Sequence, residues 1–364
     1  MKSHYFFTSV TRCSDLWKKP FKTLKLDRSE WSTGDFVVGR AIGKRNRLWE
    51  CETKTGRMAD LVRGDLLVGA LGERAATLEG VGNWRNVTAN RELDALTSAG
   101  LLGKATSISP MLPDLMRFEY LGHTTRDGEK LGMMDFVKPC RPRKPEMPVI
   151  LIIGTSMSAG KTSSGQVIIR ALNYLGFNVA ACKLTGAARY RDILKFRDAG
   201  ASDVFDFVDA GLSSTVCPEP EYRKALELIL SKIAGCHADV LVAEAGASPL
   251  EPYNGATVVE CLGDLVKFTV LCASDPYAVL GVETAYSNHL KADLVAGPAA
   301  NTTAATSLVK QLSGHKALNL LDRRMYPELV DLLTTKLNLE VPNQASKKKA
   351  PDNRRPFIEQ EKRV

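Results

Sequence analysis

Hydrophobic and polar positions follow two different patterns along the chain, and the pattern changes near residue 140. Before this point, short apolar runs are broken by glycines and polar residues, which is typical of β-strands joined by turns. After it, apolar runs alternate with segments of helical periodicity, which predicts a mostly parallel sheet covered by helices on both faces. We therefore expect two domains, the first of them rich in β structure.

The apolar runs of the second part are the predicted strands, and each ends in small or polar residues. They cover residues 149–153, 178–183, 239–244, 267–273 and 292–297. Ligands of open parallel sheets bind outside the carboxyl ends of the strands. We therefore expect the residues that follow these strands to meet at one site. The last predicted helix covers residues 326–337.

In the first part, a Gly-Asp pair opens a short apolar strand twice, at 34–35 and again at 64–65. Between the two pairs, residues 48–53 alternate in the manner of a half-buried strand. Two similar halves imply a small barrel or sandwich, and the Gly-Asp turn resembles the motif of cradle-loop β-barrels, in which the aspartate bonds to amides of a neighbouring turn. A helix is expected over residues 90–101, where three leucines lie on one side.

The glycine-containing segment 69–76 carries the adjacent opposite charges of Glu73 and Arg74. Glycines permit a close approach to a ligand, so this segment could contact one. A turn with a surface ion pair is the alternative that we favour.

Prolines and charge place the predicted domain boundaries. The stretch 139–147 combines closely spaced prolines with basic residues, which predicts a stiff linker. The predicted division is an N-terminal segment over 1–24, a β-rich domain over 25–138, the linker over 139–147, an α/β domain over 148–340, and a disordered basic tail over 341–364.

Composition narrows the class of protein. Of the 364 residues, 44% are hydrophobic and 25% charged, with no apolar stretch long enough to cross a bilayer and no secretory signal at the start. The eight cysteines lack any C-x-x-C spacing, which indicates reduced core residues. We expect a cytoplasmic protein without a membrane partner. The net charge of +8 is concentrated in the linker and tail, so nucleic acid is not an expected partner.

The most informative stretch is the decapeptide at 154–163, which lies between the first predicted strand of the second domain and a helical segment. A glycine-bounded loop in this context, ending in Gly-Lys-Thr, is a phosphate-binding loop, or Walker A motif. Its backbone N–H groups can form a nest for phosphate oxygens, aided by the positive end of the helix. The predicted nucleotide-binding residues of the loop are Gly154, Thr155, Ser158, Ala159, Gly160, Lys161, Thr162 and Ser163. Lys161 would reach the outer phosphates, and the Thr162 hydroxyl would bind Mg²⁺.

Three further residues at strand ends are candidates for chemistry. Glu244 closes an apolar strand, where a carboxylate can hold Mg²⁺ directly or through water. Lys183 could neutralise a transferring phosphoryl group or a substrate carboxylate. Asp206 is the preferred second metal ligand or general base, although Asp192 and Asp203 lie in the same segment. The alternative for Glu244 is an exposed glutamate at a strand end, and the alternative for Lys183 is a solvated lysine.

The order of these motifs resembles the dethiobiotin-synthetase-like branch of the P-loop NTPases, and within it the DgcN-like family. The matching motifs are Gly-Thr-(four residues)-Gly-Lys-Thr at 154–162, Lys-x-Thr-Gly at 183–186, Asp-Phe-Val at 206–208, and Glu-x-Gly-x-Ser at 244–248. The resemblance covers about residues 149–321. It implies an α/β fold with a P-loop NTPase domain, preceded here by a small β-rich domain where DgcN-like proteins usually carry a nucleotide-fold domain.

The resemblance also implies cofactors and roles. ATP and Mg²⁺ would be bound by Lys161, Thr162 and Glu244, with Lys183 near the substrate. Asn301 lies in a late loop that corresponds to the base-binding loops of dethiobiotin synthetases, so it is a candidate for adenine recognition. The family has been associated with acyl transfer to D-amino acids as well as with ATP-dependent chemistry.

These observations favour an ATP- and Mg²⁺-dependent enzyme that phosphorylates or activates a small, carboxylate-bearing molecule. One alternative is a nucleotide-hydrolysing switch that controls a partner bound through the N-terminal domain. Another is an acyl-CoA-dependent N-acyltransferase of the DgcN-like type. The loop has no second lysine, which argues against the dimerising ATPase switches. We expect a small-molecule substrate and a homo-oligomer.

Overall fold

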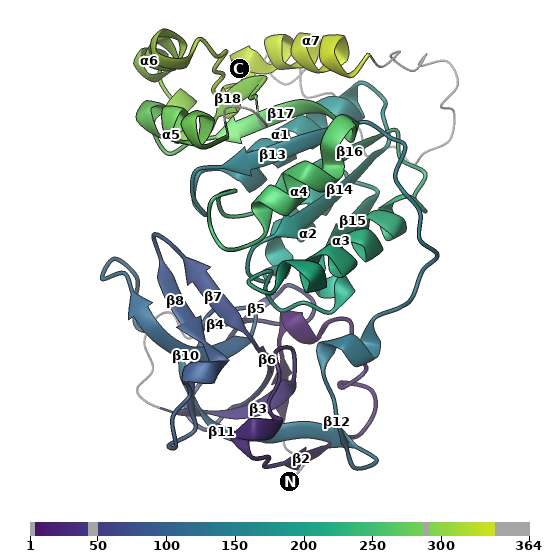
Figure 1. The fold of residues 1–364 in the computed structure, drawn as a ribbon, viewed down its shortest axis with the longest axis vertical. Coiled ribbons are helices and arrows are strands. Elements are labelled where there is room, and N and C mark those ends of the chain that lie inside the picture. The colour runs from purple at the N-terminus through teal and green to yellow at the C-terminus, as the bar shows by residue number, and fades with distance from the viewer. Residues whose placement is uncertain (1–3, 43–49, 287–290, 339–364) are drawn as a thin grey trace, which may run out of the picture.

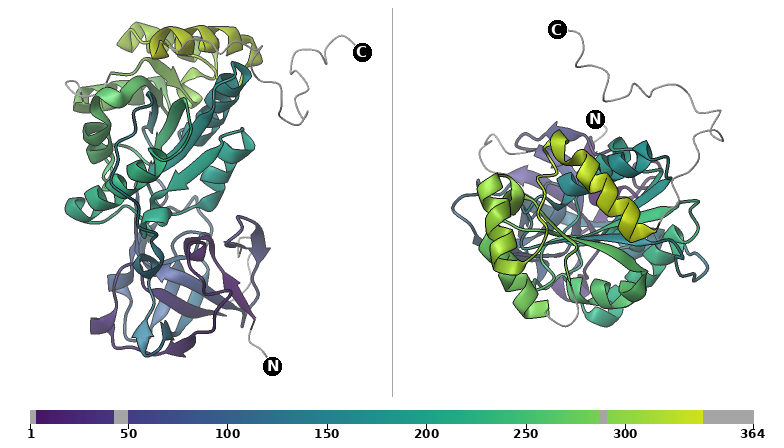
Figure 2. Two further views of the ribbon diagram at one scale, coloured as in Figure 1. Left: turned by 90° about the vertical axis from the view of Figure 1, so that its right-hand side faces the viewer. Right: turned by 90° about the horizontal axis from the view of Figure 1, so that it is seen from above.

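A computed structural model describes residues 4–42, 50–286 and 291–338 of the chain. Two domains lie one above the other in Figure 1, with the β-rich domain below and the α/β domain above. The left view of Figure 2 shows the same two lobes from the side. The predicted tail over 341–364 lies outside the described residues.

A six-stranded parallel sheet forms the centre of the α/β domain, in the order β15-β14-β16-β13-β17-β18. Its strands are β13 (Val149–Gly154), β14 (Val179–Thr185), β15 (Asp203–Asp206), β16 (Val240–Ala245), β17 (Val266–Cys272) and β18 (Leu294–Ala296). The predicted α/β class and the five predicted strands are confirmed. Strand β15 was not predicted, because its sequence Asp-Val-Phe-Asp is short and bounded by charges.

Helices cover both faces of this sheet (Figure 1). The helices are α1 (Lys161–Tyr174), α2 (Tyr190–Asp198), α3 (Glu219–Ile233), α4 (Gly255–Leu262), α5 (Pro276–Tyr286), α6 (Thr303–Ser313) and α7 (Tyr326–Leu337). Helices α1, α2 and α7 share one hydrophobic cluster with the sheet, and α3, α4, α5 and α6 share the other. Because both faces are buried, strand β13 is apolar throughout. Helix α7 has the predicted bounds.

The first domain is built on a mixed sheet in the order β1-β6-β3-β11-β9-β10-β8-β7. Its strands are β1 (Tyr5–Phe7), β2 (Lys22–Leu24), β3 (Phe36–Ile42), β6 (Leu66–Leu71), β7 (Glu73–Ala76), β8 (Gly80–Asn83), β9 (Glu92–Ala95), β10 (Leu101–Ile108), β11 (Arg117–Arg126) and β12 (Glu129–Lys130). Strands β4 (Glu50–Glu52) and β5 (Met58–Asp60) form a separate hairpin. Strand β10 also pairs with β6 over residues 101–102, so the path of pairings returns to β6. A closed barrel stays a prediction.

The repeated Gly-Asp turns have the same local structure. Gly34 and Gly64 have φ values of 86° and 97°, a backbone conformation that favours glycine. In each turn the aspartate accepts a hydrogen bond from the amide three residues earlier, at 2.7 Å for Asp35 and 2.8 Å for Asp65. The two strands that follow, β3 and β6, pair antiparallel. The prediction of two similar strand openings is confirmed.

The predicted helix over residues 90–101 is wrong. Residues 92–95 form β9, which pairs with β10 and β11, and a turn at Gly100 with φ of 89° leads into β10. Pairing on both sides of β9 decided the conformation, since three leucines are a weak helical signal without caps. Leu93 faces the core of the β-rich domain, and Leu96 faces the α/β domain.

The segments at the two predicted boundaries differ in character. Within the predicted N-terminal segment, β1 pairs with β6 and β2 pairs with β11, so this segment is part of the β-rich sheet. The linker over 139–147 has no helix or strand and runs along α3, where Cys140 and Arg143 bond to residues of that helix. No helix among the described residues is long and apolar enough to cross a membrane.

The two domains share a continuous hydrophobic cluster. From the β-rich domain it contains Val10, Leu16, Phe36, Val38, Val68, Ala70, Ala99 and Met133, and from the α/β domain it includes Phe207, Val208, Ala210 and Leu212. These α/β residues directly follow β15. The β-rich domain therefore packs against the carboxyl-end edge of the parallel sheet, which is the edge where ligands of such sheets bind.

Candidate phosphate-binding site

The loop between β13 and α1 has the strand, loop and helix arrangement that the sequence predicts. Helix α1 begins at Lys161, directly after Gly160 with φ of 90°. The Lys161 Nζ folds back over the loop and donates to the Ser156 carbonyl at 2.5 Å. A Cβ at Gly154 would lie 2.9 Å from this Nζ, so the close approach requires glycine there. Burial lowers the pKa of Lys161, and Glu244 opposes this shift. A buried cation of this kind favours an anionic partner.

Glu244 lies beside the start of α1. Its strand β16 is the neighbour of β13, with Ile152 opposite Glu244. The Thr162 Oγ1 donates to Glu244 Oε2 at 3.0 Å. Glu244 is 2% exposed, and burial raises the pKa of its carboxyl, although Lys183 and Lys161 counteract the shift. The exposed-glutamate alternative is therefore wrong.

This pair fits a magnesium ion by its chemistry. A hydroxyl and a carboxylate at one point supply the hard oxygen ligands that Mg²⁺ prefers, and this ion usually keeps several waters or phosphate oxygens as further ligands. Within the described ranges, no group of three or more His, Cys, Asp and Glu could hold a metal by itself. A magnesium ion at this pair would take its remaining ligands from waters or phosphate oxygens.

Lys183 is buried beside Glu244 and is bonded to Asp192. Strands β14 and β16 pair so that Lys183 lies opposite Glu244. The Lys183 Nζ donates to Asp192 Oδ2 at 2.5 Å. The stem of Lys183 passes between Gly186 and Gly246, where a Cβ would lie 3.2 and 3.1 Å from its Cε. Burial lowers the pKa of Lys183, but Asp192 and Glu244 more than offset this and the pKa is raised. The lysine is a fixed, charged group and not a solvated one.

Asp206 has different partners from those that the sequence suggested. Its carboxylate accepts from the Arg12 guanidinium at 2.6 Å and from the Val208 amide at 2.8 Å. Burial and the neighbouring Asp209 raise the pKa of Asp206, and Arg12 opposes them. Of the aspartates that follow Lys183, it is Asp192 that bonds to the lysine. The role of Asp206 in metal binding or catalysis stays a prediction.

Helix α2, which carries Asp192, is attached to the β-rich domain at its first turn. Both oxygens of the buried Glu52 carboxylate accept from this turn, at 2.8 Å from Tyr190 N and 2.7 Å from Arg191 N. A carboxylate at a helix start is favourable because it meets free N–H groups and the positive end of the dipole. The contact between the domains thus positions the helix that bonds to Lys183. Sequence reasoning missed Glu52, because nothing local links residue 52 to residue 190.

Asn301 lies on a loop beside the phosphate loop. It follows β18 and a short 3₁₀ turn over Pro298–Ala300, and its carbonyl accepts from Asn319 Nδ2 at 3.2 Å. Gly297 at the start of this turn is tight against the phosphate loop, since a Cβ there would lie 2.3 Å from the Ala159 carbonyl oxygen. The Asn301 residue is exposed. Its contact with a base stays a prediction, and so do the phosphate contacts of Thr155, Ser158 and Ser163.

The β7–β8 hairpin of the β-rich domain reaches toward the α/β domain (Figure 1). Near its tip, Glu79 Oε1 lies 3.4 Å from the Ser158 hydroxyl of the phosphate loop. Glu79 also pairs with Arg74, so the predicted pairing of Glu73 with Arg74 differs from the structure. Neighbouring residues of a strand point to opposite faces, and Glu73 instead lies near Arg85 at 3.7 Å.

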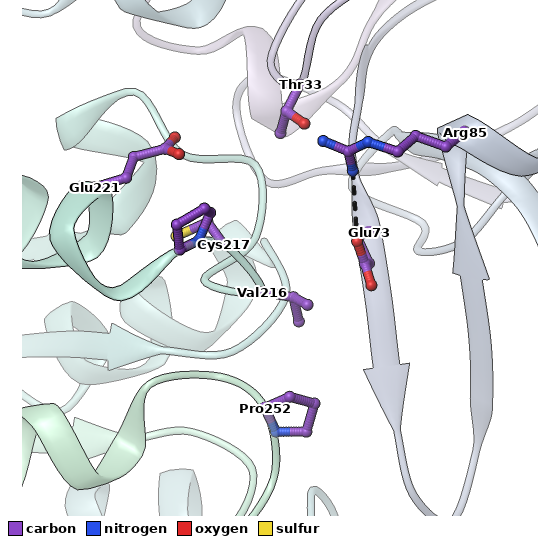
Figure 3. A pocket seen from close by; sticks show the side chains of 8 residues that line it. Thr33, Glu73, Arg85, Val216, Cys217, Glu221 and Pro252 are labelled. Atoms are coloured by element: carbon purple, nitrogen blue, oxygen red, sulfur yellow. Dashed lines mark ion pairs between the residues drawn. The ribbon is translucent and has the colours of Figure 1, made fainter.

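A cavity of about 400 Å³ lies between the two domains at the base of the same hairpin (Figure 3). It is lined by Thr33, Glu73 and Arg85 on one side and by Val216, Cys217, Pro218, Glu221 and Pro252 on the other. Burial raises the pKa of Glu73, and Arg85 opposes the shift. The cavity thus brings both signs of charge to the joint between the domains.

Comparison with known proteins shows no family. No protein-family model and no curated protein matches the sequence. Among solved structures, a DUF1611 family protein from Anabaena variabilis is similar at 15% identity and a TM-score of 0.38, over 54% of this chain and 62% of that one. The signal recognition particle receptor FtsY from Elizabethkingia anophelis is similar at 12% identity and a TM-score of 0.34, over 51% of this chain and 65% of that one. The hydrogenase maturation factor HypB from Archaeoglobus fulgidus is similar at 17% identity and a TM-score of 0.36, over 53% of this chain and 91% of that one.

The matches thus span less than two thirds of the first two of these proteins. Membership of the DgcN-like family stays a prediction.

Proposed function

We propose that the protein is an ATP- and Mg²⁺-dependent enzyme that phosphorylates or activates a small, carboxylate-bearing molecule. The observation that carries the proposal is the meeting of Lys161, the Thr162–Glu244 pair and Lys183 at the carboxyl ends of three adjacent strands. A cation, a hard-oxygen pair and a second buried cation are the groups that phosphoryl transfer requires, because its catalysis depends on positioning and electrostatic stabilisation.

Each residue has a distinct role in this proposal. The loop amides and Lys161 bind the outer phosphates, and Thr162 and Glu244 hold magnesium, which when bound neutralises charge on the phosphates. Lys183, kept charged by Asp192, orients the acceptor carboxylate or the transferred group. Lys161, Lys183 and Glu244 are buried at this edge of the sheet, and charges interact more strongly there than in water.

A nucleotide-dependent switch is the second candidate, and one contact favours it. Ser158 of the phosphate loop lies against Glu79 of the other domain, so a change in the loop would reach the β-rich domain directly. In this case the nucleotide would be hydrolysed without a small-molecule acceptor.

Ligand-dependent thermal stability tests the proposal. We expect ATP with Mg²⁺ to raise the unfolding temperature by several degrees, since a ligand at about 100 times its Kd stabilises by about 2.7 kcal/mol. ATP without Mg²⁺ should stabilise less. GTP and acetyl-coenzyme A serve as comparison ligands. Stabilisation by GTP but not ATP would overturn the nucleotide assignment, and stabilisation by acetyl-coenzyme A alone would favour the acyltransferase. ADP release that no carboxylic acid stimulates would favour the switch.

Glu244→Gln is expected to weaken magnesium dependence more than nucleotide binding. Glutamine keeps an oxygen that accepts from Thr162 but removes the charge that attracts the metal. We expect the Mg²⁺ concentration for half-maximal stabilisation to rise by about tenfold, the equivalent of about 1.4 kcal/mol, with the affinity for metal-free ATP unchanged. Titration of Mg²⁺ at fixed ATP measures this effect.

The exposed Glu119 of the β-rich domain provides the control, as Glu119→Gln. The affinity of the wild-type protein for magnesium should also decrease as pH falls. Burial raises the pKa of Glu244, and its protonated form binds metal poorly. The Gln variant should lack the part of this pH dependence that comes from Glu244, and keep the part that comes from protonation of ATP. Equal magnesium dependence in wild type and Glu244→Gln would show that Glu244 is not a metal ligand.

A further inference from the structure

Arg74 is a buried arginine of the β-rich domain, and one of its guanidinium nitrogens has no hydrogen-bond partner among the described residues. It lies on β7 and is 9% exposed. Its Nη1 donates to the Leu96 carbonyl at 2.7 Å, and its Nη2 pairs with Glu79. The Arg74 Nε is buried without a hydrogen-bond partner among the described residues. Buried donors are nearly always paired, so an unpaired guanidinium nitrogen needs an explanation.

The hairpin that carries Arg74 is attached to the phosphate-binding side of the α/β domain along its length. The Ala75 amide donates to Tyr253 Oη at 3.0 Å, and the Thr77 amide and hydroxyl donate to Glu251 at 3.0 and 2.6 Å. Both of these acceptors follow β16, the strand that ends beside the phosphate loop. The hairpin is therefore fixed beside this loop.

A single carboxylate connects Arg74 with the phosphate loop. One oxygen of Glu79 pairs with Arg74, and the other lies 3.4 Å from the Ser158 hydroxyl. Met157, the neighbouring loop residue, packs against a hydrophobic cluster that contains Leu96, whose carbonyl accepts from Arg74. Ser158 lies three residues before Lys161, in the stretch of a phosphate loop whose backbone N–H groups hold phosphate oxygens.

We propose that Arg74 is a catalytic arginine that the β-rich domain supplies to the phosphoryl group held by the loop. This inference rests on the proposed function. Glu79 occupies the position of a competing anion, and a bound triphosphate carries more negative charge than one carboxylate. The guanidinium thus transfers from Glu79 to the phosphoryl oxygens, where its planar donors match the geometry of the anion.

The reaction explains why a third cation is useful. An acceptor oxygen forms a bond to the γ-phosphorus while the bond from that phosphorus to the β,γ-bridging oxygen breaks, and the electron pair of the broken bond stays on ADP. A carboxylate acceptor brings no proton to this step. Water as acceptor releases one proton, which leaves with the phosphate product or to solvent. Negative charge grows on the bridging oxygen, and an arginine placed there stabilises it.

Lys183, another cation of this site, forms an ion pair with Asp192 of α2. It lies opposite Glu244 in the pairing of β14 with β16. Lys161 begins α1, and its Nζ donates to the Ser156 carbonyl of the loop. Arg74 belongs to the other domain and is connected to the loop through Glu79, so the transferred group would be enclosed by charges from both domains.

Binding of ADP with aluminium fluoride and Mg²⁺ tests the inference, because this complex imitates the transferred phosphoryl group. We expect fluoroaluminate to tighten ADP binding to the wild-type protein at least tenfold, measured by calorimetry. Arg74→Ala and Arg74→Lys should lose this tightening but bind Mg·ADP within about threefold of wild type. Lysine preserves the charge and much of the stem but not the planar donors, so it keeps the test valid if Arg74→Ala does not fold.

Glu79→Gln provides a change in the opposite direction. Removal of the competing carboxylate should tighten the fluoroaluminate complex about tenfold relative to wild type. This factor corresponds to about one hydrogen bond to a charged group. A merely structural role of the Arg74–Glu79 pair predicts loss and not gain in this variant. Arg85→Ala, in the 3₁₀ turn that follows β8 and lining the cavity, is the matched control and should behave as wild type.

Two results distinguish the possible failures. If Arg74→Ala and Arg74→Lys keep the full fluoroaluminate effect, Arg74 is not catalytic, although the proposed function stands. If the wild-type protein binds Mg·ADP with no fluoroaluminate effect, phosphoryl transfer itself is overturned, and the Arg74 inference falls with it.

Discussion

Lys161→Ala is expected to reduce the affinity for ATP by at least about 100-fold, equivalent to about 2.7 kcal/mol, since hydrogen bonds to charged groups contribute about 1.5–3 kcal/mol each. The lysine is buried against the loop, so its ammonium group is already in position and little conformational entropy is lost on binding. Lys161 is 3% exposed, so solvent competes little for its charge. Alanine supplies neither the charge nor the donors.

The same substitution should leave the fold intact. Burial lowers the pKa of Lys161, which means that the folded protein without nucleotide disfavours its charge. Removal of the ammonium group therefore relieves an unfavourable burial of charge, and it also removes one hydrogen bond. We expect the free energy of unfolding in the absence of nucleotide to change by less than about 1 kcal/mol.

Calorimetry with ATP and Mg²⁺ measures the affinity, and denaturation by urea measures the stability. Lys310→Ala on the exposed face of α6 is the matched control. If Lys161→Ala binds ATP as tightly as this control, the loop over 154–163 is not the nucleotide site.

Arg12→Ala is expected to lower the free energy of unfolding by about 3–5 kcal/mol, as when one partner of a buried ion pair is removed. Arg12 lies 2.6 Å from Asp206 and 3.1 Å from Asp209, and it stacks on Tyr190 at 4.7 Å. Asp206 is 1% exposed, so its carboxylate depends on protein groups to compensate its charge. The variant leaves a buried carboxylate at the joint between the domains.

The loss of stability in Arg12→Ala should depend on pH. Burial and Asp209 raise the pKa of Asp206 even with Arg12 present, and loss of the cation raises it further. The folded variant then binds a proton that the unfolded chain, with an aspartate pKa of about 3.9, releases. Stability therefore falls as pH rises from the unfolded pKa through the raised folded pKa. We expect a smaller loss at pH 5 than at pH 8.

A second variant separates this charge effect from lost packing. In Arg12→Ala with Asp206→Asn, the side chain still has an oxygen to accept from Val208 N but carries no charge. This double variant should recover part of the stability and lose the pH dependence. Lys19→Ala, which removes an exposed partner of Asp15, is the control. A loss in Arg12→Ala as small as in this control would show that the pair contributes nothing to the joint.

The positions that sequence reasoning placed well depend on local patterns. The strands of the α/β domain are apolar because both faces of the sheet are buried, and the glycine-bounded loop before Lys161 is a contiguous motif. Glu244 follows from a general rule of parallel sheets, since residues at the ends of neighbouring strands lie side by side. That Glu244 and Lys183 are neighbours follows from the pairing of β14 with β16 and needed no knowledge of the other domain.

The helix expected over residues 90–101 shows the limit of such patterns. Leucines at 93, 96 and 101 indicate one apolar side, but in the structure they serve two different hydrophobic clusters. Pairing with β10 and β11 stabilises the extended form. Strand preference depends on neighbours that are distant in the chain, so a short run does not reveal it.

The amino-acid sequence by itself determined the parallel sheet, the phosphate loop and the strand-end residues, because each is encoded by residues close together in the chain or by the order of strands. Only the tertiary structure decided which partners the charged residues have. Arg12 meets Asp206 across 194 positions, and Ser158 meets Glu79 across 79. Such contacts arise where one domain packs on the other, and hydrophobic periodicity does not record how two domains are oriented. The charges that surround the site were therefore visible in the sequence, but their pairing was not.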